Sequence, residues 1–108
     1  MRVLKITDYT EFPGPNLIKN GNYSGEYFYN ILKPMFEKAL KSKEKVLVDL
    51  DGTGGFGFGW QRQLFGSLWK DFTKEVVLEN LIIKSDEEPY LISETIEEIF
   101  IKEMEPYE

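Results

Sequence analysis

Residues Lys45 to Trp60 read K-V-L-V-D-L-D-G-T-G-G-F-G-F-G-W, a run of Val and Leu that leads into two carboxylates and a loop with five glycines. Val and Leu on both faces are typical of a parallel strand that is buried between helices. The sequence therefore predicts a central strand over Lys45 to Leu50. Ligands and partners bind at the carboxyl ends of parallel strands. Asp49, Asp51 and the glycine loop lie at such an end, so they are candidates for a functional site.

The segment before the central strand contains strand, turn and helix signals. Val3 to Thr7 alternates enough to be an opening strand, and Leu17 to Lys19 is expected to form a second strand at an edge of the sheet. Ser24 can cap a helix in which apolar residues recur with the helical period as far as Leu40. Pro34 is expected to bend or divide that helix, because its ring collides with the preceding turn.

Helical periodicity returns after the glycine loop. Trp60 to Phe72 is expected to be a helix, and close packing of this helix on the sheet would explain Gly66 in its middle. Thr73 can cap a short helical turn, and Leu81 to Lys84 has the composition of another strand.

The last part of the chain carries a helical pattern and an acidic segment. A helix is expected to start at Ser85 or Asp86, before Pro89. The acidic residues from Glu94 onward are typical of a solvated helix face, followed by a frayed end after Pro106.

Strands that alternate with helices predict the α/β class. We expect one domain over residues 1–108, with an acidic tail from about residue 103 and a mixed, mostly parallel sheet of about four strands packed with three to four helices. The 108 residues, of which 42% are hydrophobic, suffice for a single core and not for two.

The composition excludes several classes of function. Net charge is −6, from 13 basic and 19 acidic residues, whereas nucleic-acid binding needs a basic surface. No apolar run approaches the ~20 residues of a membrane span, so we expect a cytoplasmic protein without a membrane partner. The chain has no Cys and no His, which leaves carboxylate chemistry with Mg²⁺ as the main enzymatic option.

The two carboxylates allow an enzymatic interpretation. The sequence V-L-V-D-L-D-G-T, which ends at Thr53, resembles the first motif of the haloacid dehalogenase phosphatases. That resemblance implies Asp49 as nucleophile and Asp51 as general acid, with both as ligands of Mg²⁺. The rest of that pattern is missing, since no clear paired acidic motif follows a strand in the C-terminal half. The alternative is that both aspartates accept backbone N–H bonds in a tight turn and only shape it.

The loop also fits a dinucleotide-binding pattern, Gly52-x-Gly54-x-x-Gly57, between a strand and a helix. That site also needs an acid about 20 residues on, at the end of the next strand. Here the interval falls on Glu75 to Glu79, before the next strand begins, and the carboxylates at the loop mouth would repel a pyrophosphate. We therefore expect no cofactor and no bound metal.

Six short motifs, in order and with consistent spacing, resemble the STAS-like domains of bacteria, which are related to the sulphate transporter and anti-sigma factor antagonist domain. The resemblance covers nearly everything except the acidic tail. The motifs are P-G-P-N at 13–16, N-Y-S-G-E-Y-F at 22–28, L-K-P-M-F-E-K-A-L at 32–40, V-L-V-D-L-D-G at 46–52, F-G-S-L at 65–68 and L-I-I-K-S-D at 81–86.

The resemblance implies a non-catalytic regulatory or adaptor domain that docks on a protein partner. In anti-sigma antagonists the partner is a histidine-kinase-like ATPase, and phosphorylation of a Ser in the loop after the central strand breaks the complex. In this chain that loop contains no Ser, and Thr53 falls several residues early, so a phosphorylation switch is not expected. We expect a monomer or a weak homodimer.

Three aromatic residues alternate with glycines in the loop, which can present large apolar side chains to a partner. The alternative is that Phe56, Phe58 and Trp60 fold under the loop and complete the core. We expect Gln63 to face solvent. For Arg62, exposure to solvent is likewise the simpler alternative to a specific contact. The residues predicted to bind the partner are Asp51, Gly52, Thr53, Gly54, Gly55, Phe56, Gly57, Phe58, Gly59, Trp60 and Arg62.

Overall fold

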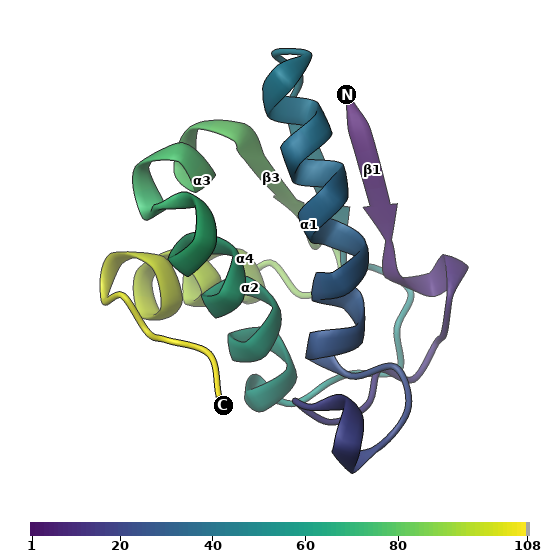
Figure 1. Cartoon of the computed structure of the whole chain (residues 1–108). Coiled ribbons are helices and arrows are strands. Elements are labelled where there is room, and N and C mark those ends of the chain that lie inside the picture. Colours follow the sequence, from purple (N-terminus) through teal and green to yellow (C-terminus); the bar gives the residue numbers. More distant parts are fainter. Residues whose placement is uncertain (108) are drawn as a thin grey trace.

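The computed structural model describes residues 1–107, which form a two-layer α/β domain (Figure 1). In this part of the chain, three parallel strands pair in the order β1-β2-β3. The strands are β1 (Arg2–Lys5), β2 (Val46–Asp49) and β3 (Leu81–Lys84). The helices are α1 (Gly25–Lys41), α2 (Phe58–Phe72), α3 (Lys74–Asn80) and α4 (Tyr90–Glu94), with short 3₁₀ turns η1 (Ile6–Asp8) and η2 (Ile18–Asn20) and a π-helical segment η3 (Thr95–Ile101).

The α/β class is confirmed, but the predicted fourth strand at Leu17 to Lys19 is wrong. Residues Ile18–Asn20 form the 3₁₀ turn η2, in which the Asn20 and Gly21 N–H groups donate to the carbonyls of Leu17 and Ile18 at 3.0 and 3.2 Å. These donors are satisfied locally, so they are not available for a neighbouring strand. The Leu17 side chain, which lies just before this turn, is buried.

Helix α1 starts where the sequence predicts and is not divided. Ser24 caps it, because its Oγ accepts the Tyr27 N–H at 2.9 Å. The helix continues through Pro34, whose position is exposed. The carbonyl of Asn30, which a proline four residues later leaves without its helical donor, also belongs to an exposed residue and can bond to water.

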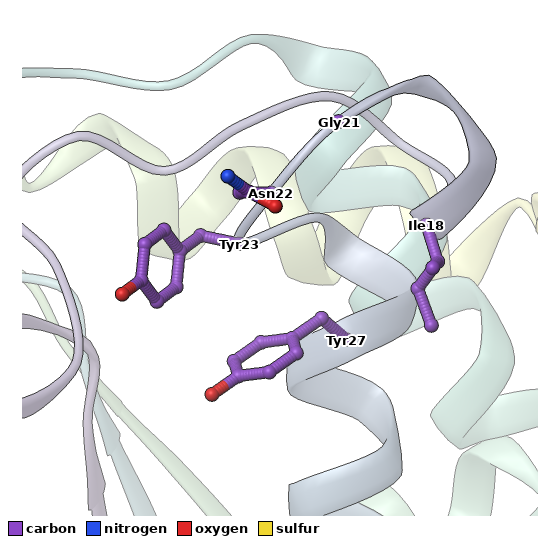
Figure 2. A pocket seen from close by; sticks show the side chains of 5 residues that line it. All are labelled: Ile18, Gly21, Asn22, Tyr23 and Tyr27. Carbon is purple, nitrogen blue, oxygen red and sulfur yellow. The ribbon is translucent and has the colours of Figure 1, made fainter.

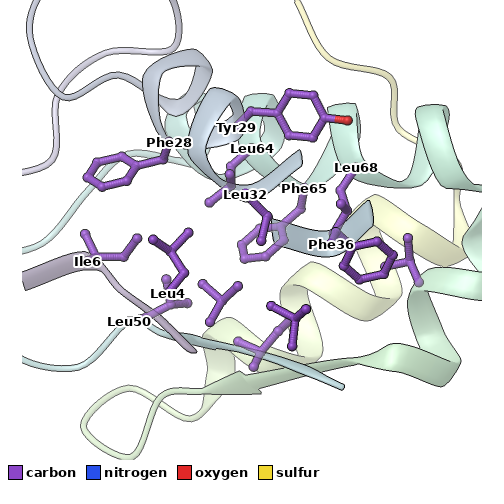
Figure 3. Packing of buried hydrophobic residues seen from close by; sticks show 14 of the residues in the cluster. Leu4, Ile6, Phe28, Tyr29, Leu32, Phe36, Leu50, Leu64, Phe65 and Leu68 are labelled. Carbon is purple, nitrogen blue, oxygen red and sulfur yellow. The ribbon is translucent and has the colours of Figure 1, made fainter. Parts of the chain in front are cut away.

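The core lies between one face of the sheet and helices α1 and α2 (Figure 3). Leu4, Val48 and Ile83 are register partners on this face and are buried. The expectation that β2 is buried on both faces is wrong: Leu47 is only half-buried on the opposite face, and its register partner Val3 is 53% exposed. The described helices cover one side of the sheet and leave the other side open.

Gly66 has a different explanation from the predicted one. A Cβ at this position would lie 2.9 Å from the Met104 carbonyl oxygen and 3.0 Å from the Pro106 nitrogen. The close neighbour of Gly66 is therefore the C-terminal tail and not the sheet.

Within residues 1–107, no helix combines the length and apolar character needed to cross a membrane.

Candidate functional site

A carboxylate clamp joins the carboxyl ends of β2 and β3. Asp51 Oδ2 accepts hydrogen bonds from Lys84 Nζ at 2.6 Å and from the Asp86 N–H at 3.1 Å. Its Oδ1 accepts the Glu87 N–H at 3.0 Å, and the Asp51 N–H donates to Asp49 Oδ1 at 3.0 Å. These bonds give both aspartates a part in shaping the turns after two neighbouring strands.

The same donors hold Asp51 in its charged form. The Glu87 N–H, followed by the ammonium of Lys84, lowers the pKa of the Asp51 carboxyl from 3.8 to about 2. The hydrogen bond to Asp51 is in turn the main reason that the pKa of Lys84 is raised. A general acid must carry a proton near neutral pH, so Asp51 is poorly suited to that role.

Asp51 is expected to make the stability of the fold depend on pH in the acidic range. Its folded pKa of about 2 lies below the ordinary value, so its stabilising contribution is complete above about pH 4 and disappears as the pH falls towards about 2. We expect the Asp51→Asn variant to be less stable than the native chain at pH 7 and to lose less stability between pH 4 and 2. Thermal unfolding midpoints from pH 2 to 7 measure this. Asp86→Asn is the control, and equal acid profiles for Asp51→Asn and the native chain would contradict the prediction.

A polar pocket of about 270 Å³ lies beside the clamp. Its ionisable lining is acidic, so it is unfavourable for a phosphate group. Among the described residues, no three acidic side chains are grouped so that they could hold a metal ion. The pocket is lined by Leu50, Asp51, Gly52, Thr53, Ser85, Glu87 and Glu88.

The first half of the glycine loop is fastened to neighbouring segments. Gly52 has a φ of 86°, and its N–H donates to the Glu87 carboxylate. The Thr53 hydroxyl donates to the Leu50 carbonyl at 3.4 Å, and the Gly54 N–H donates to the Glu11 carbonyl at 2.6 Å. The backbone of this half is therefore held in one shape.

The second half of the loop is open. Gly55 has a φ of 110°, which few residues other than glycine adopt. Apart from the glycine itself and its two chain neighbours, no described residue has an atom within 4 Å of a Cβ built at Gly55 or Gly57. The loop therefore leaves its outer side accessible between Gly54 and Phe58.

The three loop aromatics lie in different surroundings. Trp60 is 1% exposed, and its Nε1 donates to the Tyr23 carbonyl at 3.1 Å. Phe56 is half-buried against Trp60, with ring centroids 4.5 Å apart. Phe58, in contrast, is 38% exposed. The predicted set of three aromatic anchors thus reduces to one exposed ring, while Trp60 belongs to the core.

Phe12 is an exposed aromatic residue that sequence reasoning did not select. It is 72% exposed, although its ring lies only 2.7 Å from where a Gly54 Cβ would be. The signal that could have found it is a large apolar residue beside Pro13 in a turn, where no core position is available. Phe12 and Phe58 therefore both expose rings at the loop, and we call Phe12 with residues 54–58 the loop surface.

Arg62 and Gln63 do not simply face solvent. Arg62 Nε donates to the Glu105 carbonyl at 2.6 Å, and Gln63 is buried and accepts the Tyr107 N–H at 2.8 Å. Gly59 lies beside the same tail, since a Cβ there would be 3.8 Å from the Tyr107 ring. The predicted frayed end after Pro106 is also wrong for the described residues, because the tail packs on α2.

A pocket of about 390 Å³ with both polar and apolar lining groups lies beside the start of α1 (Figure 2). Tyr23 and Tyr27 face it, and the Tyr23 carbonyl is the acceptor for the Trp60 indole. Its lining carries no formal charge and also includes Ile18, Gly21 and Asn22.

Comparison with known proteins gives one match. The model of the STAS-like domain of unknown function covers residues 24–91, from the cap of α1 to α4, and thus more than half of the chain. It includes the carboxylate clamp and the glycine loop but neither β1 nor the C-terminal tail. No curated protein and no solved structure matches this chain. On the extent of the family match, the chain belongs to the STAS-like family of unknown function.

Proposed function

We propose that this STAS-like domain is a non-catalytic regulatory or adaptor protein that binds a protein partner through the loop surface. The observation that carries the proposal is the pair of exposed aromatic rings, Phe12 and Phe58, at a glycine loop with an open outer side. Aromatic side chains, Phe among them, are enriched in protein interfaces relative to the rest of the surface.

The anchoring of the loop supports this role. Gly52 and Gly54 donate hydrogen bonds to Glu87 and Glu11, which belong to segments before and after the loop in the sequence. A loop that is already ordered loses little conformational entropy when a partner binds. The bare backbone at Gly55 and Gly57 lets a partner approach the loop closely.

The partner that we propose is a folded protein, and the histidine-kinase-like ATPases bound by anti-sigma antagonists are the first class to test. A phosphorylation switch is not part of the proposal. Thr53 carries the only hydroxyl among residues 52–60, and it is partly buried and donates to the Leu50 carbonyl.

The phosphotransferase alternative receives less support from the same geometry. It needs Asp51 as a protonated acid, but Lys84 and two N–H groups occupy both of its oxygens and lower its pKa to about 2. A phosphate-ester panel with the native chain and the Asp49→Asn variant tests the alternative. Turnover that disappears in the variant would favour the enzyme over the adaptor.

Partner binding is expected to depend on Phe12 and Phe58. A Phe12→Asp, Phe58→Asp double variant should bind its partner more than about tenfold more weakly, because each change puts a charge where an apolar ring is buried on binding. The measurement is affinity capture from the native cell lysate with mass spectrometry, followed by calorimetry with the purified partner.

The matched control is Leu78→Asp, since Leu78 is 40% exposed on α3, outside the loop surface. It should retain the partner. Equal capture by the native chain and the double variant would contradict the proposal, and so would equal loss in the Leu78→Asp control.

A further inference from the structure

The C-terminal tail lies along the outer face of α2. After η3 the chain reverses at Glu103, which has a φ of 52°, and residues 103–107 run back towards the first turn of α2 (Figure 1, yellow). Contacts follow this path, from Trp69 with Met104 to Gln63 with Tyr107. The tail is therefore an extended segment that is seated on a helix face.

Side chains of α2 hold this segment by its main chain. Trp69 Nε1 donates to the Met104 carbonyl at 2.8 Å. Arg62 Nε donates to the Glu105 carbonyl at 2.6 Å, and Gln63 Oε1 accepts the Tyr107 N–H at 2.8 Å. Because every peptide carries these carbonyl and N–H groups, these three contacts do not require this particular sequence.

Gly66 provides the space for a main chain. A Cβ there would lie 2.9 Å from the Met104 oxygen and 3.0 Å from the Pro106 nitrogen, both of which are backbone atoms. Any side chain at this position would push the segment away from the helix. A glycine in a helix interior is otherwise unfavourable relative to alanine.

Charge and aromatic contacts favour an acidic segment. Lys70 lies 3.4 Å from Glu105, and Lys74 lies 3.1 Å from Glu103. The Arg62 guanidinium lies 4.3 Å from the centre of the Tyr107 ring. The basic groups beside this segment contrast with the overall charge of −6.

Much of the tail's side-chain surface remains exposed. Glu103, Glu105 and Tyr107 are exposed, while Met104 and Pro106 are half-buried. Exposed ion pairs of this kind contribute little to stability. Segments with few buried contacts open at a lower free energy than the core.

We propose that the outer face of α2 between Arg62 and Lys70, together with Lys74, is a peptide-binding groove that residues 103–107 occupy in the same chain. Its second occupant is an extended acidic segment of a partner protein, of the form Glu-x-Glu-Pro-Tyr. Because a tethered segment acts at an effective concentration on the order of mM, the partner segment competes with the tail. This groove is separate from the loop surface, and the proposal does not depend on the adaptor role.

The test uses a fluorescent peptide with the sequence of residues 102–107, K-E-M-E-P-Y, and measures its anisotropy with the full chain. The tail is weakened by Met104→Gly with Tyr107→Ala, or by Glu105→Lys with Tyr107→Ala, which keeps Met104. Each weakened chain should bind the peptide at least about tenfold more tightly than the native chain does. Addition of Gly66→Val, or of Trp69→Phe to remove only the N–H donor, should reverse that gain.

Four results would overturn the proposal. The first is a weakened chain that binds no more tightly than the native one, and the second is binding that is unchanged by Gly66→Val. The third is loss of cooperative unfolding in both weakened chains, which would make the tail part of the core. The fourth is a native dimer in sedimentation that Tyr107→Ala abolishes, since the second occupant would then be another copy of this chain.

Discussion

Replacement of Trp60 by alanine is expected to lower the free energy of unfolding by about 3–5 kcal/mol, the usual cost of removing a buried aromatic side chain. Trp60 is packed between Phe28, with ring centroids 5.6 Å apart, and Phe56, at 4.5 Å. Its Nε1 also satisfies the Tyr23 carbonyl at 3.1 Å, and the variant loses this bond. Denaturant unfolding at neutral pH measures the change.

Two controls separate packing from the hydrogen bond. Trp60→Phe keeps much of the ring contact and loses the N–H, so its effect should lie between those of the native chain and Trp60→Ala. Phe58→Ala changes an aromatic residue in the same helix that is partly exposed, and its effect should be within about 1 kcal/mol. If Trp60→Ala also stayed within that range, the assignment of Trp60 to the core would be wrong.

The second large effect is expected at Gly25, where the first turns of α1 and α2 meet. A Cβ there would overlap the Trp60 carbonyl and lie 2.9 Å from Gln63 Cβ and 3.3 Å from the Leu64 nitrogen. Two of these atoms are backbone and cannot move without shifting α2. Gly25→Ala is therefore expected to destabilise the fold by about 1–3 kcal/mol, as overpacked cores do.

The same substitution at Gly59 is the matched comparison. Gly59 also lies in a first helical turn, but the nearest atom to its added Cβ is 3.8 Å away, which is an ordinary contact. Because alanine favours a helix over glycine by about 1 kcal/mol, Gly59→Ala should be neutral or stabilising. Thermal unfolding of both variants measures the difference, and equal midpoints would contradict the close approach at Gly25.

Sequence reasoning predicted the elements that depend on local rules. The cap at Ser24 and the helical period after it were sufficient to place α1. The strand at Leu81 to Lys84 was predicted with the bounds that the structure has. The prediction of a strand at Leu17 to Lys19 is wrong because an extended strand needs a neighbour to pair with. The local sequence carries no information about that neighbour.

The prediction that all three loop aromatics are exposed anchors is wrong for a geometric reason. Phe56, Phe58 and Trp60 are spaced by two, which in an extended loop would put their side chains on one side. Helix α2 instead begins at Phe58, and at 3.6 residues per turn Phe58 and Trp60 point about 200° apart. One ring therefore enters the core while the other stays exposed. Phe12 belongs to the loop surface because its ring contacts Gly54, and no local sequence pattern reveals this tertiary contact.

The small parallel sheet has a consequence for self-association. Its outer strands β1 and β3 each contain four residues and lie at the two ends of the strand order. Arg2 and Lys5 are on β1, and Lys84 is on β3. Short edges are poor templates for another strand, since pairing would gain few hydrogen bonds, and charged side chains on an edge disfavour such pairing further. These edges therefore protect the chain against strand-by-strand aggregation.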